Sequence, residues 1–273
     1  MLHIDDPGDP RLDDYRHLTD AAARRSIEAS GAPHGIFVVE GPLALDQLRA
    51  SDHHVRSVLV TPSRAATSAE RLEGLGPVYV AERPVLAEVC GFDVHRGILA
   101  AAERPAPATP AEVLSGRTRV LILEGVSDNE NVGALFRNAA ALGIDAVLLD
   151  PTCTDPLYRR SIRVSSGWTL RLPFARGATT ADLLAAVRHH GLRSIALTPI
   201  DTAVAVDTAA ASGLLDDPVA LVVGAEGPGL SARTIAACDA AVRVPMAPGV
   251  DSLNVATSLA VVAAFAGARR DWS

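Results

Sequence analysis

The residues with the clearest chemical potential lie in a loop at 224–229, which reads GAEGPG. The apolar run 219–223 before it predicts a buried strand, and the glycines and proline prevent the loop from continuing that strand. Glycine lets the backbone approach a ligand closely, so the free N–H groups of such a loop can bind one. A second expected strand, 242–244, ends nearby, and a long apolar helix that Ser252 would cap starts near Leu253. These converging strand ends, loops and helix start predict a ligand site.

Three segments, spread over roughly half of the chain, carry a resemblance to a known family. Residues 224–231 read GAEGPGLS, residues 244–246 read VPM with SLNV at 252–255, and residues 131–139 read NVGALFRNA. In this order they resemble the motifs of the SpoU (TrmH) family, which are 2'-O-ribose RNA methyltransferases of the SPOUT class. The loop is not the dinucleotide fingerprint, because its order is G-x-x-G-x-G and it lies far from the N-terminus. One departure is Asn129, where the family commonly has proline, an exchange expected to loosen that loop.

The resemblance implies an α/β protein with two domains. Residues 113–273 are expected to form a SPOUT catalytic domain with a parallel sheet and a deep trefoil knot. Residues 1–105 are similar, through FVVEG at 37–41 and HRG at 95–97, to the small L30e-like α/β domain that binds substrate RNA in many members. Between them, residues 103–112 hold three prolines in the sequence ERPAPATPAE and predict a semi-rigid linker.

The hydrophobic pattern predicts alternating strands and helices in both parts. The expected strands are 36–40, 57–61, 78–81, 98–102, 119–124, 146–150, 194–198, 219–223 and 242–244. The expected helices are about 18–29, 42–50, 65–72, 84–90, 131–142, a helix within 155–166, 180–190 and 253–266. Asn131 would cap the helix at 131–142, and Gly143 would end it.

The resemblance further implies a homodimer that binds S-adenosylmethionine (AdoMet), largely through backbone groups of three loops. The implied cofactor residues are Thr198, Gly224, Glu226, Gly227, Val244, Met246 and Leu253. The implied catalytic residues are Arg137, Asn131, Glu226, Ser252 and Asn254. Arg137 would act near the AdoMet of the other subunit, where it would grip a phosphate or help to deprotonate a ribose hydroxyl. Glu226, Ser252 and Asn254 would orient the nucleotide and Asn131.

The chemistry makes orientation the main task of such a site. A ribose 2'-hydroxyl is a poor nucleophile, so it must lie in line with the S–CH₃ bond and have its proton removed or shared. The sulfonium is already activated. Residue patterns alone leave structural explanations open: a surface ion pair for Arg137, a helix cap for Asn131, a turn cap for Glu226, and a helix start for Ser252 and Asn254.

The formal net charge of −7 has the wrong sign for a protein that coats nucleic acid. An RNA enzyme of this composition therefore needs locally concentrated arginines, and the chain contains no lysine, which genome composition explains. The candidate RNA contacts are Arg24, Arg25, His95, Arg96, Arg159, Arg160 and Arg163. Pairing with the chain's own acids is the alternative for the arginines of 155–166, and a solvated helix face or surface turn is the alternative for the others.

Other features exclude several classes of protein. The three cysteines are widely spaced without a metal-ligand pattern, so they fit reduced core thiols of a cytoplasmic protein, and no metal is expected. Apolar runs end well short of about 18 residues, and the start lacks an apolar stretch, so neither a membrane span nor a signal peptide is expected. A chain without lysine has no P-loop.

Three readings of the function remain. The small N-terminal domain favours a 2'-O-methyltransferase acting on structured ribosomal RNA, such as 23S ribosomal RNA. The first alternative is a tRNA methyltransferase. The second is an RNA-binding module of the same fold without activity, against which the intact motif residues argue.

Overall fold

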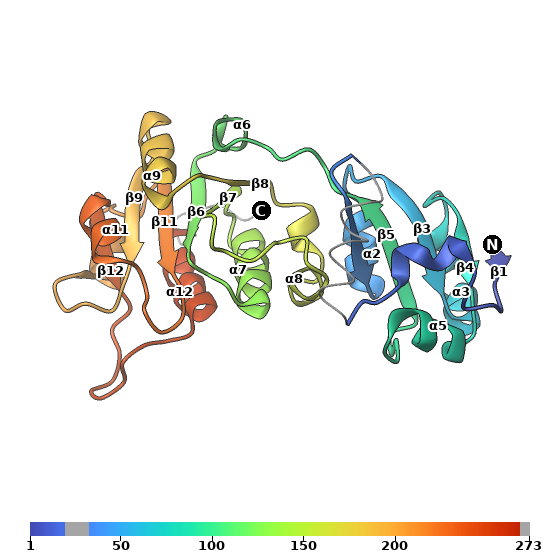
Figure 1. Cartoon of the computed structure of the whole chain (residues 1–273). Helices are drawn as coiled ribbons and strands as arrows, with labels where there is room; N and C mark the ends of the chain where they lie inside the picture. The colour runs from blue at the N-terminus through green and yellow to red at the C-terminus, as the bar shows by residue number, and fades with distance from the viewer. Residues whose placement is uncertain (20–32, 268–273) are drawn as a thin grey trace. The chain divides into compact units, whose positions relative to one another are not determined.

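A computed structural model gives the fold and describes residues 1–19 and 33–267. The chain divides into two compact units (Figure 1): residues 1–106 with 157–171, and residues 107–156 with 172–273. The division at 106/107 falls within the predicted linker. Residues 157–171 were expected in the C-terminal domain, but they pack with the N-terminal unit. Arg24 and Arg25 lie outside the described residues.

The first unit is built on a five-stranded sheet of mixed direction. From edge to edge its strands are β1 (Leu2–His3), β4 (Val78–Val80), β3 (Val55–Val60), β5 (Ile98–Glu103) and β2 (Ile36–Glu40). β5 is antiparallel to β2 and β3, and the other neighbours are parallel. β2 is buried along its whole length although it lies at an edge, because α2 (Pro42–Arg49) and α8 (Arg159–Val164) pack against it.

The described part of this unit also contains several short helices. Besides α2 and α8 they are η1 (Pro10–Tyr15), α3 (Pro62–Thr67), α4 (Ala69–Leu72), α5 (Arg83–Cys90) and η2 (Trp168–Leu170). The single helix expected at 65–72 is wrong, because the backbone of Ser68 leaves the helical region at φ −126° and ψ 21°. The Tyr15 hydroxyl lies 2.8 Å from Ser57 Oγ in the core, so the N-terminal segment is fixed to the sheet.

The second unit is built on a seven-stranded sheet in which every strand is parallel to its neighbours. In order the strands are β10 (Val204–Ala205), β12 (Ala240–Arg243), β9 (Arg193–Leu197), β11 (Val219–Gly224), β6 (Arg119–Glu124), β7 (Ala146–Leu149) and β8 (Phe174–Arg176). The predicted parallel sheet is confirmed. β8 and β10 were not expected, because two or three residues are too few to give a periodic signal.

Central strands of this sheet are apolar on both faces, as burial between two helical layers requires. On β6, Leu121 and Leu123 face one core, and Val120 and Ile122 face the other. The helices of the first layer are α7 (Asn129–Ala141), α10 (Val206–Ala211) and α12 (Val255–Gly267). Those of the second are α6 (Pro110–Leu114), α9 (Thr180–His189) and α11 (Ala232–Ala237).

α7 and α12 lie side by side in the first layer (Figure 1). The side-chain amide of Asn138 donates a hydrogen bond to the carbonyl of Ala256 at 2.8 Å, which fixes the two helices to each other. They carry the first and last of the sequence motifs, so this packing brings residues from distant parts of the chain together. No helix within the described ranges is long and apolar enough to cross a lipid bilayer.

Candidate active site

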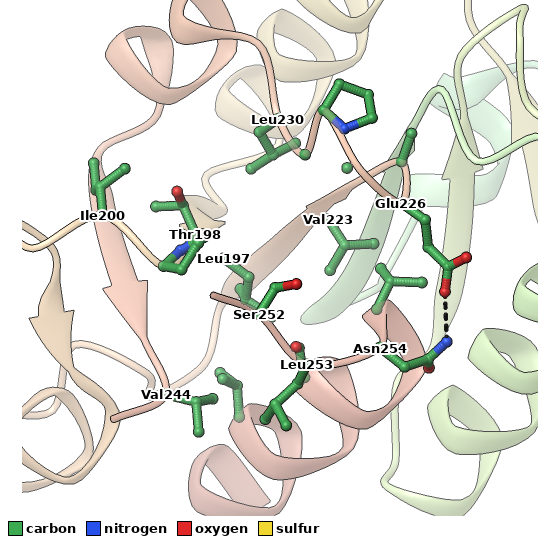
Figure 2. Close-up of a pocket in the computed structure, with 18 of the residues that line it drawn as sticks. Leu197, Thr198, Ile200, Val223, Glu226, Leu230, Val244, Ser252, Leu253 and Asn254 are labelled. Atoms are coloured by element: carbon green, nitrogen blue, oxygen red, sulfur yellow. Dashed lines mark hydrogen bonds between the residues drawn. The ribbon is translucent and has the colours of Figure 1, made fainter. Parts of the chain in front are cut away.

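Three loops at the carboxyl ends of β9, β11 and β12 enclose a cavity of about 520 Å³. Its lining comes mainly from residues 197–200, 223–230 and 244–255. Figure 2 shows Thr198 and Ile200 on one side of the cavity and Glu226 and Asn254 on the other. The volume falls within the range of small-molecule sites, which lie at strand ends in parallel sheets of this kind.

All seven residues predicted to bind a cofactor line this cavity. Ser252 and Asn254 line it too, whereas Asn131 and Arg137 do not. The sequence did not single out the apolar lining residues Leu197, Ile200 and Leu230, because nothing distinguishes a cavity wall from a core position in an apolar run.

The glycine loop is a closed turn that no larger residue could form at its base. A Cβ atom at Gly224 would lie 2.2 Å from the carbonyl carbon of Gly229 and 2.3 Å from the amide nitrogen of Leu230. The amide of Gly229 donates to the carbonyl of Ala225 at 3.0 Å and closes the turn. Gly227, at φ +83°, would meet no protein atom within 4 Å of an added Cβ, so its backbone borders open space.

Asn254 joins the three sequence motifs through its side-chain amide. Its Nδ2 donates to Asn131 Oδ1 at 2.9 Å. It also donates to Glu226 Oε1 at 2.7 Å (Figure 2). Its Oδ1 accepts hydrogen bonds from the amides of Ala256 and Thr257, so Asn254 also caps α12. Because Nδ2 faces two oxygen acceptors and Oδ1 faces two N–H donors, these hydrogen bonds fix the orientation of the Asn254 side-chain amide.

Two expected helix caps are therefore wrong. Ser252 does not cap the last helix, because α12 begins at Val255 after Asn254. Asn131 does not cap α7, because the carboxylate of Asp128 accepts from the amides of Glu130 and Asn131 at 2.8 and 2.9 Å. Asn131 instead sits buried in the first turn, where its side chain is available to Asn254.

Arg137 lies on the same helix but points elsewhere. Six residues of helix put it about 9 Å along the axis and about 120° round from Asn131. It is exposed, and its side chain forms no ion pair or hydrogen bond with any residue that the structure describes. A cation left unpaired in a protein with excess acid is available to a ligand or a second subunit.

Glu124, at the end of β6, holds the far end of the glycine loop. Its carboxylate accepts hydrogen bonds from the amide and hydroxyl of Ser231, both at 3.1 Å, and from the hydroxyl of Thr234 at 2.7 Å. Gly224, at the near end, pairs with Glu124 across the sheet. Both ends of the loop are thus attached to one residue, which sequence reasoning missed.

A second loop, before α7, is tied to the turn that follows β7. Asp150 Oδ2 accepts from the amide of Gly125 at 3.1 Å, and the Thr154 hydroxyl donates to Asn129 Oδ1 at 2.8 Å. Burial raises the pKa of Asp150, but hydrogen bonds from Thr152 and Cys153 outweigh it and hold that pKa below its usual range. The Asn129 hydrogen bond restrains this loop where the family commonly has proline.

The predicted RNA contacts of the first unit fall into two groups. Arg159 pairs with the buried carboxylate of Glu40, and its guanidinium lies 4.6 Å from the ring centroid of Phe92. Arg163 lies 3.9 Å from the same carboxylate. For these two arginines the structure has an intramolecular partner, which is the alternative that the sequence left open.

Arg160, His95 and Arg96 are exposed on the first unit. His95 Nδ1 lies 3.3 Å from the carboxylate of Asp93. An added Cβ at Gly41 would lie 2.7 Å from Cδ of Arg96, so the Arg96 side chain rests directly on that glycine.

The cysteines take no part in the cavity. Cys90 and Cys153 are buried, and Cys238 is half-buried. Burial raises the pKa of Cys153 to about 12 and that of Cys238 to about 11, so neither is a thiolate at neutral pH. The described residues contain no group of His, Cys, Asp and Glu side chains that could hold a metal ion.

Comparison with known proteins agrees with the motifs. The profile of the SpoU rRNA Methylase family matches residues 118–264. A Mycobacterium bovis protein named an uncharacterized tRNA/rRNA methyltransferase is 42% identical over 257 residues, covering 94% of this chain and 88% of that protein. The 23S rRNA (guanosine-2'-O-)-methyltransferase RlmB of Yersinia pestis is 32% identical over 70% of this chain and 78% of its own.

The fold also matches solved structures. The crystal structure of an AdoMet-bound rRNA methyltransferase from Sinorhizobium meliloti superimposes with a TM-score of 0.77 over 97% of this chain and 96% of that chain, at 22% identity. At this identity the likeness supports the fold, and it extends over both units of the chain.

Proposed function

Because the chain belongs to the SpoU rRNA methylase family, we propose that it transfers a methyl group from AdoMet to a ribose 2'-hydroxyl of RNA. The observation that carries this proposal is the hydrogen-bonded set Asn131–Asn254–Glu226 at the edge of the three-loop cavity. The Yersinia pestis relative, whose name specifies 23S rRNA, favours ribosomal RNA over tRNA as the substrate.

The residues of the cavity fit AdoMet. The backbone of the cavity at Gly224 and Gly227 can approach a ligand closely. Apolar side chains of the cavity, such as Leu197 and Leu253, offer a surface for a flat adenine ring. When bound, AdoMet supplies a methyl group already activated on a sulfonium. We propose that the cavity loops form part of the family's deep trefoil knot around residues 219–262.

The residues of this chain then have to place the ribose. Glu226 is exposed at the rim, and Asn254 holds one of its carboxylate oxygens. A carboxylate fixed in this way can accept a hydrogen bond from a ribose hydroxyl and orient it. Ser252 offers a second polar group on the loop that carries Asn254. Asn131 and the cap of α12 hold Asn254, which in turn holds Glu226.

We propose that Arg137 of a partner subunit supplies the acid–base or phosphate-binding group of the reaction. Within its own chain Arg137 does not line the cavity. α12 and the neighbouring loop expose apolar side chains, with Phe265 41% and Leu253 38% exposed. An apolar surface beside a ligand site suits a subunit interface, so we propose a homodimer that completes each site.

Glu124 is expected to position the glycine loop for AdoMet. Glu124→Ala removes three hydrogen bonds from the start of α11, so the Kd for AdoMet should rise about tenfold, whereas Glu124→Gln keeps an acceptor and should stay within about threefold. Isothermal titration calorimetry gives both values, with the melting temperature as a control for folding. If a folded Glu124→Ala protein bound AdoMet with wild-type affinity, Glu124 would not position the glycine loop for AdoMet.

We place the enzyme in the cytoplasm, with the first unit as its RNA-binding part and no need for a metal. The experiment is methyl transfer from labelled AdoMet to ribosomal RNA and tRNA from a deletion strain, followed by mapping of ribose methylation. Methylation of ribosomal RNA at one nucleotide is the expected result. Methylation of tRNA alone would change the substrate, and RNA binding without AdoMet binding would favour the inactive RNA-binding module.

A further inference from the structure

The segment 157–171 of the first unit exposes only aromatic and arginine residues. Its exposed residues are Tyr158, Arg160, Trp168 and Arg171, and all its other residues are buried or half-buried. Tyr158 is 37% exposed and Trp168 is 36% exposed. Among the described residues Phe265, in the second unit, is the only other large aromatic side chain in this class. Two of the three exposed aromatic residues thus occur together with two arginines in one short segment.

The inner side of this segment is fixed to the rest of the first unit. Arg159 is held by Glu40 and by the ring of Phe92. A Cβ atom at Gly167 would lie 2.7 Å from Cβ of Gln47 on α2, so the backbone there rests directly on that helix. The inner side chain of Arg159 and the backbone at Gly167 therefore hold this segment against the first unit.

The turn between α8 and η2 has a strained conformation. Ser166 has φ 54° and Gly167 has φ 88°, so both lie in the left-handed region, which is uncommon for serine. The turn is held by hydrogen bonds from the Gly167 amide to the Ile162 carbonyl and from the Trp168 amide to the Ser165 carbonyl. Residues kept in such conformations cluster at binding sites, and this one sets the direction of Trp168.

We propose that Tyr158, Arg160, Trp168 and Arg171 form a binding surface for unpaired RNA, here called the aromatic–arginine surface. Indole and phenol rings stack on exposed bases of any sequence, and arginines bind phosphates and stack as well. The side chain of Arg171 forms no ion pair or hydrogen bond with the described residues, so its charge is available. A protein with a net charge of −7 needs locally concentrated arginines to bind RNA, and this segment supplies them. The proposal rests on the proposed RNA substrate.

The first test uses the fluorescence of Trp168. The chain has two tryptophans, so Trp272→Phe leaves Trp168 as the only indole. A uridine-rich single-stranded RNA of about 12 nucleotides should quench this fluorescence saturably, and the same sequence in a duplex should quench it much less, because its bases are already stacked. Constant fluorescence while a labelled copy of the single strand saturates the protein would overturn the proposal.

The second test separates stacking from apolar packing. Trp168→Phe keeps a flat ring and should bind the single strand within about threefold of wild type, whereas Trp168→Leu should bind about tenfold more weakly. Leu2→Ala is the control, because Leu2 is exposed on β1, at the sheet edge opposite the one that carries α8. AdoMet affinity and melting temperature should stay unchanged in all three.

Two outcomes of the second test would contradict the proposal that the aromatic–arginine surface binds RNA. One is wild-type RNA affinity in Trp168→Leu. The other is dissociation of an oligomer by Trp168→Leu in sedimentation, which would make the surface a protein contact. Methyl transfer tests the proposed function separately. If Trp168→Leu methylates RNA with an unchanged KM for RNA, the surface fails and the function stands; if wild type quenches with RNA but transfers no methyl group, the function fails and the surface stands.

Discussion

Gly224→Ala is expected to raise the Kd for AdoMet about 100-fold and to reduce methyl transfer correspondingly. The added methyl group would lie 2.2 and 2.3 Å from backbone atoms of Gly229 and Leu230, which cannot rotate away as a side chain could. The turn must open by a substantial fraction of an ångström, and its amides and carbonyls then leave their places. Losing about two hydrogen bonds to a ligand corresponds to this change in affinity.

Substitutions at two other glycines serve as controls for the effect of Gly224→Ala. Gly227→Ala meets no protein atom within 4 Å but is strained at φ +83°, so it should weaken binding less than Gly224→Ala does. Gly116→Ala has a similar φ of +71° and open space, but lies away from the cavity, so it should leave AdoMet affinity unchanged. If all three variants bind AdoMet equally in calorimetry while remaining folded, the glycine loop does not form the cofactor site.

Most of the fold was predictable because its strands are long enough to show a pattern. β6 contains the apolar run 120–123 and β11 the apolar run 219–223, and burial on both faces of a parallel sheet requires that composition. The family and the fold class are confirmed. The knot, the domain boundaries and the roles of the site residues stay predictions.

The errors at the helix starts have a common cause. SLN at 252–254 and DNEN at 128–131 each offer several polar residues that could cap a helix, and propensity cannot choose among neighbours. In the structure Asn254 and Asp128 cap the helices. The choice depends on tertiary contacts, because Asn254 must also reach Asn131, which lies 123 residues earlier.

Two features could not be seen in one sequence at all. Glu124 contacts Ser231 across 107 residues, and a glutamate at the end of a buried strand carries no sign of its partner. The segment 157–171 has the composition of an ordinary basic helix. Its attachment to the first unit depends on the buried carboxylate of Glu40, which lies 119 residues from Arg159.

Arg137→Ala is expected to lower methyl transfer by about two orders of magnitude or more, while folding, dimerisation and AdoMet binding stay nearly intact. This is the scale of a lost acid–base or charge-stabilising group. The side chain is exposed and lacks a partner among the described residues, so its removal breaks no internal contact. Rates at saturating RNA and AdoMet measure the effect, and Arg137→Lys should recover part of it if a phosphate contact is what matters.

The site of action of Arg137 is tested by mixing two inactive proteins, Arg137→Ala and Gly224→Ala, under conditions of subunit exchange. If each cavity uses the arginine of the partner, a mixed dimer contains one site with an intact glycine loop and an intact Arg137. Equal amounts should then recover about a quarter of wild-type activity, since half of the dimers are mixed and each has one working site. If Arg137 serves the cavity of its own chain, every site in the mixture carries one defect, and activity stays at the level of the separate variants. Mixed dimers proven by mass spectrometry, yet inactive, would therefore rule out the shared site.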